Sequence, residues 1–134
     1  MIGYRLMKSN FFLCIGLISL ALSQNQIASD LNGESYYDRL GHSVSLKSDA
    51  NGTYLAVGVP EYDSAGLNSG QVKVYSLLDN SWVQSGDDIN GLSSNELSGF
   101  SVSISSDGNS VAVGSPQYNH CLLYTSPSPR DLRK

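Results

Sequence analysis

An internal repeat restricts the possible folds of this chain more than any other feature of its sequence. Residues 30–63 align with residues 88–119, at an offset of 58 as far as Asp49 and of 56 from Gly52 onward, and sixteen of the 32 aligned positions are identical. The identities include Asp30/Asp88, Asn32/Asn90, Gly33/Gly91, Gly41/Gly99, Ser43/Ser101, Val44/Val102, Ser45/Ser103, Ala56/Ala112, Val57/Val113, Gly58/Gly114 and Pro60/Pro116. Repeats of this length are typical of propeller blades and solenoid units, in which each unit buries its apolar face only by stacking on a neighbour.

Alternating apolar and polar residues predict an all-β structure within each copy. We expect strands over about residues 43–47, 54–59, 71–77 and 81–84 in the first copy, and 101–105 and 110–115 in the second. Asn51-Gly52 predicts a tight hairpin, because both residues tolerate positive φ. The predicted fold is a partial β-propeller of about one and a half four-stranded antiparallel blades, with a first repeat at residues 24–85 and a truncated second repeat at 86–120.

The first 23 residues have the features of a secretory signal peptide. Basic residues precede an apolar run over residues 11–22, and the small residues Ala21 and Ser23 suit a signal-peptidase site. The run of 12 residues is shorter than the roughly 20 residues of a membrane-spanning helix. We therefore expect a signal peptide at residues 1–23, with Met7 as an alternative start, and a secreted, extracellular or cell-surface location.

The last 14 residues differ in character from the rest of the chain. Residues 121–131 resemble the in-frame translation of a sequencing-library adapter, and such segments are excluded from fold reasoning. A natural tail rich in Ser and Pro is the alternative. We expect residues 121–134 to be an artefact, the natural sequence to diverge near Asn119 or His120, and the whole protein to be longer.

Residues 24–120, between these two ends, are strongly acidic. They contain eleven acidic and three basic residues, which gives a net charge of −8. Such a surface repels phosphate backbones and anionic lipids, so we expect no nucleic-acid partner and no membrane insertion after signal cleavage. The two cysteines, Cys14 and Cys121, lie outside this part, so the sequence predicts no disulfide framework within it.

Short motifs recur in the same order in both copies. Gly99-Phe100-Ser101-Val102 precedes Val113-Gly114-Ser115-Pro116, as Gly41-His42-Ser43-Val44 precedes Val57-Gly58-Val59-Pro60. These resemble the Phe-Gly and Gly-Ala-Pro landmarks of FG-GAP repeats, which build integrin-α-type β-propellers. Bacterial secreted or cell-surface proteins of this type are a closer likeness, through Asp30-Leu31-Asn32-Gly33-Glu34, Ser106-Asp107-Gly108, Gly70-Gln71-Val72-Lys73-Val74-Tyr75 and Trp82-Val83-Gln84.

The resemblance covers about residues 28–119. It implies a non-enzymatic extracellular or cell-surface propeller for adhesion or recognition, with an unknown extracellular protein or glycan as its ligand. It also implies calcium in the loop between the first two strands of a blade, but this chain departs from that pattern. The first copy offers only Asp49 and Asn51, and the second only Asp107, whereas calcium takes roughly six to eight oxygen ligands. We predict no metal ligand and no cofactor.

Two polar groups resemble functional sites only superficially. Asp63 and Asn68, in the long loop over residues 61–70, are the other candidate metal site, but solvation explains them more simply. Gly41-His42-Ser43 resembles a nucleophile elbow, which requires a strand-turn-helix setting. The second copy replaces His42 with Phe100, so packing is the simpler interpretation. We predict no catalytic residue, and His120, at the junction with the tail, supports none.

Aromatic residues are open to two interpretations. Trp82 and Tyr75 lie on predicted strands, and we expect them to pack between blades. Tyr62 and its counterpart Tyr118 follow the prolines that end strands, where loops emerge, so ligand contact stays open for them. Asn51-Gly52-Thr53 is a glycosylation sequon, which matters only in a host that modifies it.

The leading hypothesis for function is a secreted or cell-surface binding module that is not an enzyme. The alternative is the scaffold portion of a longer secreted hydrolase or lyase with its catalytic residues downstream, and a structural spacer is a third possibility. Residues 24–120 expressed alone are expected to be marginally stable or to aggregate. An incomplete ring leaves apolar faces and strand edges bare.

Overall fold

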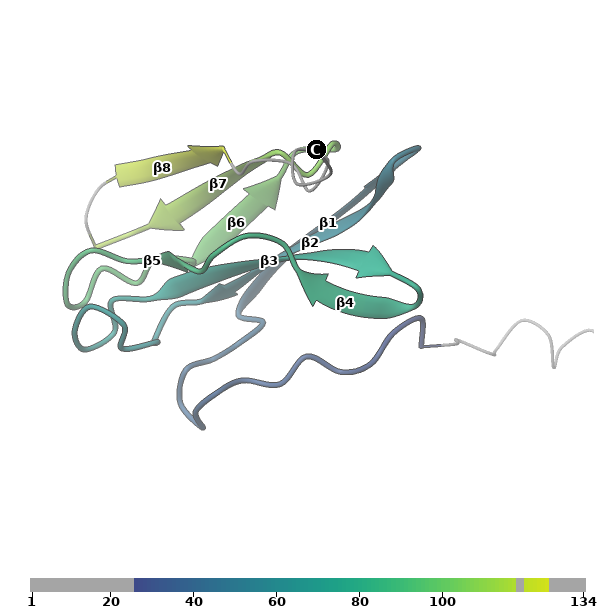
Figure 1. Cartoon of the computed structure of the whole chain (residues 1–134). Helices are drawn as coiled ribbons and strands as arrows, with labels where there is room; N and C mark the ends of the chain where they lie inside the picture. The colour runs from purple at the N-terminus through teal and green to yellow at the C-terminus, as the bar shows by residue number, and fades with distance from the viewer. Residues whose placement is uncertain (1–25, 118–119, 126–134) are drawn as a thin grey trace, which may run out of the picture.

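The computed structural model describes residues 26–117 and 120–125, with side chains described as far as residue 117. The predicted signal peptide and residues 126–134 of the predicted artefact lie outside the described residues. The described part is all β, as predicted, with eight strands in two antiparallel sheets (Figure 1).

The first sheet is an antiparallel meander in the order β1-β2-β3-β4. Its strands, which confirm the four predicted from the first copy, are β1 (Ser43–Asp49), β2 (Gly52–Val59), β3 (Gln71–Leu78) and β4 (Ser81–Gln84). A short strand, β5 (Ile89–Asn90), pairs with Gln71 and Val72 at the start of β3. It was not predicted, because two residues are too few to show an alternating pattern.

The second sheet has the order β6-β7-β8. Strands β6 (Ser101–Ile104) and β7 (Ser110–Ser115) were predicted, whereas β8 (His120–Thr125) was not. Residues from Cys121 onward were predicted to lie outside the fold, but their backbone through Thr125 continues this sheet. The free edge of β7 presents N–H and C=O groups with which an extended segment pairs. The origin of the segment stays a prediction.

Two of the three hairpins of the first sheet are closed by two-residue loops, but by different means. Asp79 and Asn80, between β3 and β4, have φ values of 47° and 59°, as in a type I′ turn. The tight hairpin predicted at Asn51-Gly52 is present between β1 and β2, but neither of these residues has the positive φ that was given as the reason for it. Instead Asp49 Oδ1 accepts hydrogen bonds from their N–H groups, at 2.7 and 3.0 Å. A side-chain acceptor therefore closes the first hairpin.

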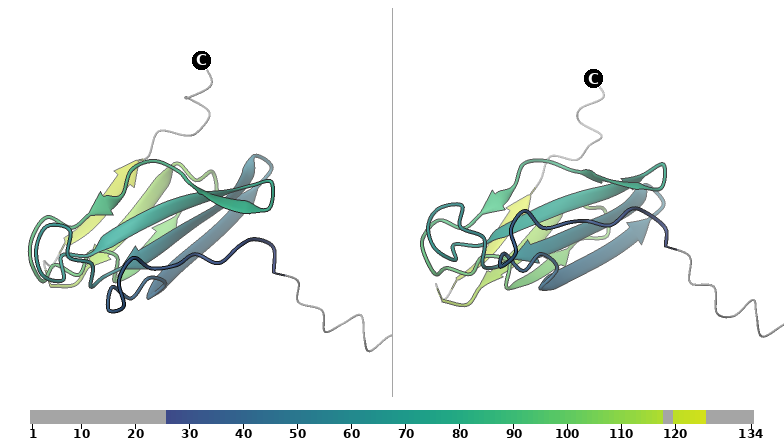
Figure 2. Two further views of the ribbon diagram at one scale, coloured as in Figure 1. Left: turned by 60° about the horizontal axis from the view of Figure 1, so that its bottom comes forward. Right: turned by 90° about the horizontal axis from the view of Figure 1, so that it is seen from below.

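The two sheets pack on each other around one apolar core (Figure 2). We call the contributing sides the packed faces of the two sheets. The packed face of the first sheet consists of Tyr54, Ala56, Val72 and Val74, and that of the second of Val102, Ile104, Val111 and Val113. The segment over residues 26–42 runs along the opposite side of the first sheet. The first sheet is thus the middle layer of the molecule.

Candidate functional site

Three loop segments meet at one end of the sheets, and we call them together the loop end. They are residues 30–41 before β1, residues 61–70 between β2 and β3, and residues 88–99 before β6. Backbone hydrogen bonds join the second and third segments, for example from Leu97 N to Asn68 O at 3.1 Å and from Ser98 N to Ser69 O at 3.0 Å. Side chains join the first segment to the second, as described below.

A small pocket lies where residues 32–40 cross the start of β3. Its cavity volume is about 10 Å³, which is room for roughly one water molecule. The polar side chains that line it include Glu34, Asp38, Tyr62, Gln71 and Lys73. Among these five, only Tyr62 is a candidate ligand contact on the basis of the sequence, which leaves packing and ligand contact open for it.

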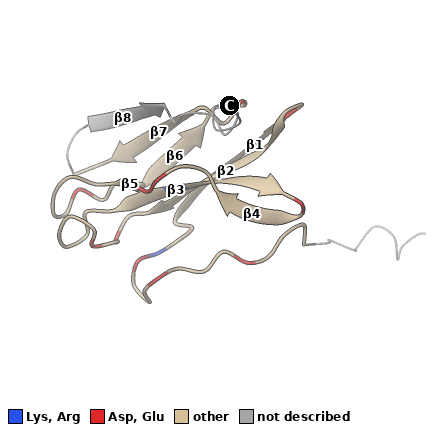
Figure 3. Cartoon of the chain, viewed as in Figure 1, with Lys and Arg blue, Asp and Glu red and all other residues tan. Residues whose placement is uncertain are grey.

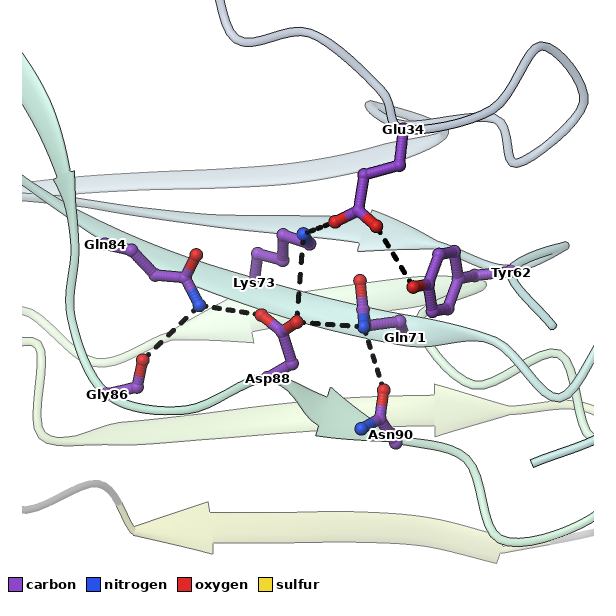
Figure 4. A network of polar contacts seen from close by, with 8 residues as sticks. All are labelled: Glu34, Tyr62, Gln71, Lys73, Gln84, Gly86, Asp88 and Asn90. Atoms are coloured by element: carbon purple, nitrogen blue, oxygen red, sulfur yellow. Dashed lines mark hydrogen bonds and ion pairs between the residues drawn. The ribbon is translucent and has the colours of Figure 1, made fainter. Parts of the chain in front are cut away.

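Lys73 is the centre of a polar network beside this pocket (Figure 4). Its ammonium group is paired with Glu34 Oε1 and lies 3.8 Å from Asp88 Oδ2, and its side chain is only 13% exposed. Tyr62 donates its hydroxyl hydrogen to Glu34 Oε2 at 3.1 Å. Glu34 therefore links the segment before β1 to the long loop and to β3.

The network continues from Lys73 to β5 through a buried amide. Gln71 Nε2 donates to Asp88 Oδ2 at 3.1 Å and to Asn90 Oδ1 at 2.9 Å. Gln84 Nε2 donates to the other oxygen of Asp88 at 2.6 Å. Asp88 thus accepts hydrogen bonds from β3 and β4 and holds the start of the β5 segment against the sheet.

The electrostatics of the network favour a fixed pattern of charge. The hydrogen bond from Lys73, followed by that from Tyr62, lowers the pKa of Glu34. Burial works against the charged form of Lys73, but its hydrogen bond to Glu34 and the charge of Asp88 raise its pKa overall. The hydrogen bond to Glu34 raises the pKa of Tyr62. At neutral pH Glu34 and Lys73 therefore stay ionised and Tyr62 stays neutral. None of the three is tuned to exchange protons near pH 7.

Two buried oxygen atoms among the residues that line the pocket have no hydrogen-bond donor in the described part of the chain. They are Asp38 Oδ2 and Gln71 Oε1, in residues that are 7% and 2% exposed. Buried acceptors are normally paired. The pocket has room for about one water molecule, which is the size of donor that these two acceptors could take. Within residues 26–117, no three His, Cys, Asp or Glu side chains are grouped as metal ligands.

An exposed aromatic pair lies in the same segment as Glu34 and Asp38. Tyr36 and Tyr37 are 94% and 79% exposed, and their rings meet edge to face with centroids 5.3 Å apart. Exposed tyrosines are typical of contact surfaces, because they combine a large apolar area with a hydroxyl group. These two tyrosines were not among the predicted contact residues. Two adjacent tyrosines where the second copy has Ser94 and Asn95 were the available signal.

The loop end is acidic (Figure 3). Its three segments contain seven acidic residues and one basic residue, Arg39. Arg39 pairs with Glu61 at 3.2 Å, which is a second link between the first segment and the long loop. Asp63 Oδ1 accepts a hydrogen bond from Asn68 N at 2.7 Å, so these two residues brace the long loop. The surface charge of this end therefore favours cationic partners.

The other acidic residues considered in the sequence lie apart from the loop end. Asp49 closes the β1–β2 hairpin, as described above. Asp107 Oδ1 accepts hydrogen bonds from Ser105 Oγ at 2.6 Å and from Asn109 N at 3.1 Å, and so closes the β6–β7 turn. Both carboxylates are engaged by their own turns.

The remaining predicted residues are also dispersed. His42 contacts Phe100, its counterpart in the repeat, with ring centroids 4.8 Å apart. Tyr75 is 9% exposed and Trp82 is half-buried. The side chains of Tyr118 and His120 lie outside the described residues.

No protein-family model matches the chain, and no curated protein sequence matches it. Among residues 26–117 and 120–125, no helix has the length and apolar character needed to cross a membrane.

Proposed function

We propose that the chain belongs to an extracellular or cell-surface β-propeller of the FG-GAP type and acts as a non-enzymatic recognition module. The observation that carries the proposal is the stacking of two sheets whose sequences are related by the repeat. The packed face of the second sheet covers that of the first, as neighbouring blades cover each other in a propeller. Secretion, implied by the predicted signal peptide, is part of the same proposal.

Backbone geometry at aligned positions supports a common origin of the two units. Arg39 and Leu97 have φ values of 58° and 56°, which residues with a Cβ rarely adopt. The next turn is closed in the same way in both units, by hydrogen bonds of 3.1 Å from His42 N to Arg39 O and from Phe100 N to Leu97 O. Different side chains therefore accompany the same unusual backbone, which favours duplication.

Ligand contact in this proposal takes place at the loop end. Tyr36 and Tyr37 supply the exposed aromatic surface and two hydroxyl groups. Together with the acidic charge, these groups favour a basic protein surface over an anionic glycan. A neutral glycan is the second ligand class, because its hydroxyl groups can exchange hydrogen bonds with the exposed hydroxyls of Tyr36 and Tyr37.

The test is a binding screen of the full chain against basic extracellular proteins and neutral glycans. For any ligand found, we expect the double variant Tyr36→Ala/Tyr37→Ala to bind at least about tenfold more weakly, as loss of an aromatic hot spot does. Leu78→Ala is the matched control, because Leu78 is 52% exposed and lies at the β3–β4 turn. A ligand whose affinity falls with the control but not with the tyrosine variant would contradict the proposal.

A further inference from the structure

The first sheet exposes apolar residues on the side opposite its packed face. This outer face consists of Val44 and Leu46 on β1 and of Leu55 and Val57 on β2, paired as Val44 with Val57 and Leu46 with Leu55. Val44 is 62% exposed and Leu46 is 57% exposed. Two adjacent exposed aliphatic residues on an edge strand form a surface on which another sheet could pack.

The repeat alignment shows which face of the second sheet is equivalent to this outer face. Its four residues align with Val102, Ile104, Val111 and Val113, which form the packed face of the second sheet. There, Ile104, Val111 and Val113 are at most 2% exposed. In the first sheet the two β2 positions are also covered, since Val57 is 3% exposed and Leu55 is half-buried, so the open part of this face is Val44 and Leu46 on β1.

Polar contacts show how the covered unit is held. Ser43 Oγ donates to Gly99 O at 2.7 Å, and Ile104 N donates to Ser45 Oγ at 3.2 Å. Ser43 and Ser45 thus fasten β6 to the first sheet. Their counterparts in the repeat, Ser101 and Ser103, are exposed on the far side of the second sheet.

Two aligned glycines, Gly41 just before β1 and Gly99 just before β6, also differ in whether they are covered. Gly99, with φ of 85°, lies so close to Gln71 and Val72 that a Cβ atom would collide with the carbonyl oxygen of Gln71 and with Cγ2 of Val72. Gly41, its counterpart, has φ of 84°, yet no heavy atom lies within 4 Å of where its Cβ would be. Gly41 therefore has the backbone conformation used at a close contact but makes no such contact within the described chain.

We propose that the outer face of one chain binds the far side of the second sheet of another copy of the same chain, head to tail. That far side carries Ser101, Ser103, Ala112 and Gly114. These residues align with Ser43, Ser45, Ala56 and Gly58, which lie on the face of the first sheet that the second sheet covers inside each chain. In the complex, Ser101 Oγ donates to Gly41 O of the neighbouring chain. Ser103 Oγ accepts from Leu46 N of that chain.

The two surfaces differ, so the interface is heterologous. Association of this kind forms a ring if the rotation closes and an open filament if it does not. The proposal rests on the repeat alignment and on the packing inside one chain. It does not depend on which ligand the loop end recognises.

Complementary single variants of the full chain test the proposal. Leu46→Glu damages the outer face, and Ser103→Glu damages the far side of the second sheet, where both side chains are exposed. Leu92→Glu is the control, because Leu92 is 76% exposed, lies on neither surface and aligns with Glu34. Sedimentation velocity reports the size of each species, and circular dichroism reports whether each variant keeps its strands.

We expect wild type and the control to form oligomers, and each of the two interface variants to be monomeric. An equimolar mixture of Leu46→Glu and Ser103→Glu is expected to form a dimer and nothing larger, since each chain contributes one intact surface. The proposal is overturned if wild type is monomeric, if either interface variant is as large as wild type, or if the mixture stays monomeric.

Discussion

The two sheets carry the same apolar positions on the corresponding face, yet that face is covered in the second sheet and open along β1 in the first, although Val57 on β2 is only 3% exposed. Val113 is fully buried in the core, whereas Val44 and Leu46, on the equivalent face of the first sheet, are more than half exposed. The alternating pattern decides which side of a strand is apolar. Whether that side is buried depends on what stacks against it, so aligned positions should differ in their effect on stability.

The largest difference is expected between Ile104 and its counterpart Leu46. Ile104 is 2% exposed, and truncation to Ala should lower the free energy of unfolding by about 2 to 5 kcal/mol through lost burial and a cavity. Leu46→Ala, on the exposed outer face, should change it by less than about 1 kcal/mol. Urea unfolding in dilute solution measures both. Equal losses would mean that the two faces are equally buried.

A smaller difference is expected between two glycines. Alanine at either Gly99 or Gly41 meets the left-handed φ, which costs roughly 1 to 2 kcal/mol. At Gly99 the added methyl group also meets the backbone of Gln71, so we expect a further loss of about 1 to 3 kcal/mol. Thermal unfolding of the two variants, compared at one concentration, checks this. A Gly41→Ala variant that is the less stable of the two would contradict the assigned contact.

The aligned carboxylates Glu96 and Asp38 provide a third comparison. Glu96 is 2% exposed, and its Oε2 accepts hydrogen bonds from Leu92 N at 2.6 Å and Ser93 N at 3.1 Å. Glu96→Ala should cost about 1 to 3 kcal/mol because it leaves both N–H groups without this acceptor. Asp38→Ala should cost less, since Asp38 Oδ2 accepts no hydrogen bond from the described residues. Chemical denaturation ranks the pair, and the reverse order would refute the prediction.

The smallest effect concerns Glu34, which aligns with Leu92. Hydrogen bonds from Lys73 and Tyr62 lower the pKa of Glu34, so its charged form stabilises the folded chain above its usual pKa of about 4. That contribution is lost as the pH falls through the lowered pKa. Glu34→Gln should therefore melt slightly below wild type at pH 7, and the difference should vanish in stronger acid. The same difference in melting temperature at both pH values would show that the ion pair does not matter.

The strands that could be predicted from the sequence are those with a local signal in their own residues or in the repeat. The β-branched and alternating residues of β1, β2, β3 and β7 located those strands, and the repeat located β6. Alternation could not detect the two residues of β5. It also gave no warning of β8, because strand pairing there depends on a free edge on β7 rather than on the segment itself. At the β1–β2 hairpin, the carboxylate of Asp49 replaced the expected positive φ.

The candidate site was harder to predict than the strands. Lys73 and Glu34 are 39 positions apart, and each is an ordinary charged residue in its own segment. Only the crossing of the segment before β1 over the start of β3 makes them partners. Tyr62 was open to two interpretations in the sequence, and its hydrogen bond to Glu34 places it in the network beside the pocket.

The sequence by itself determined the all-β class, the boundaries of most strands and the presence of two related units, because period-two alternation and the repeat are properties of neighbouring or aligned residues. The tertiary structure decided which face of each unit is buried and which charges are paired. It also decided where the acceptors of Asp38 and Gln71 are left without donors. These features arise from contacts between segments far apart in the chain, and the free energy of such contacts depends on packing geometry that no local pattern encodes.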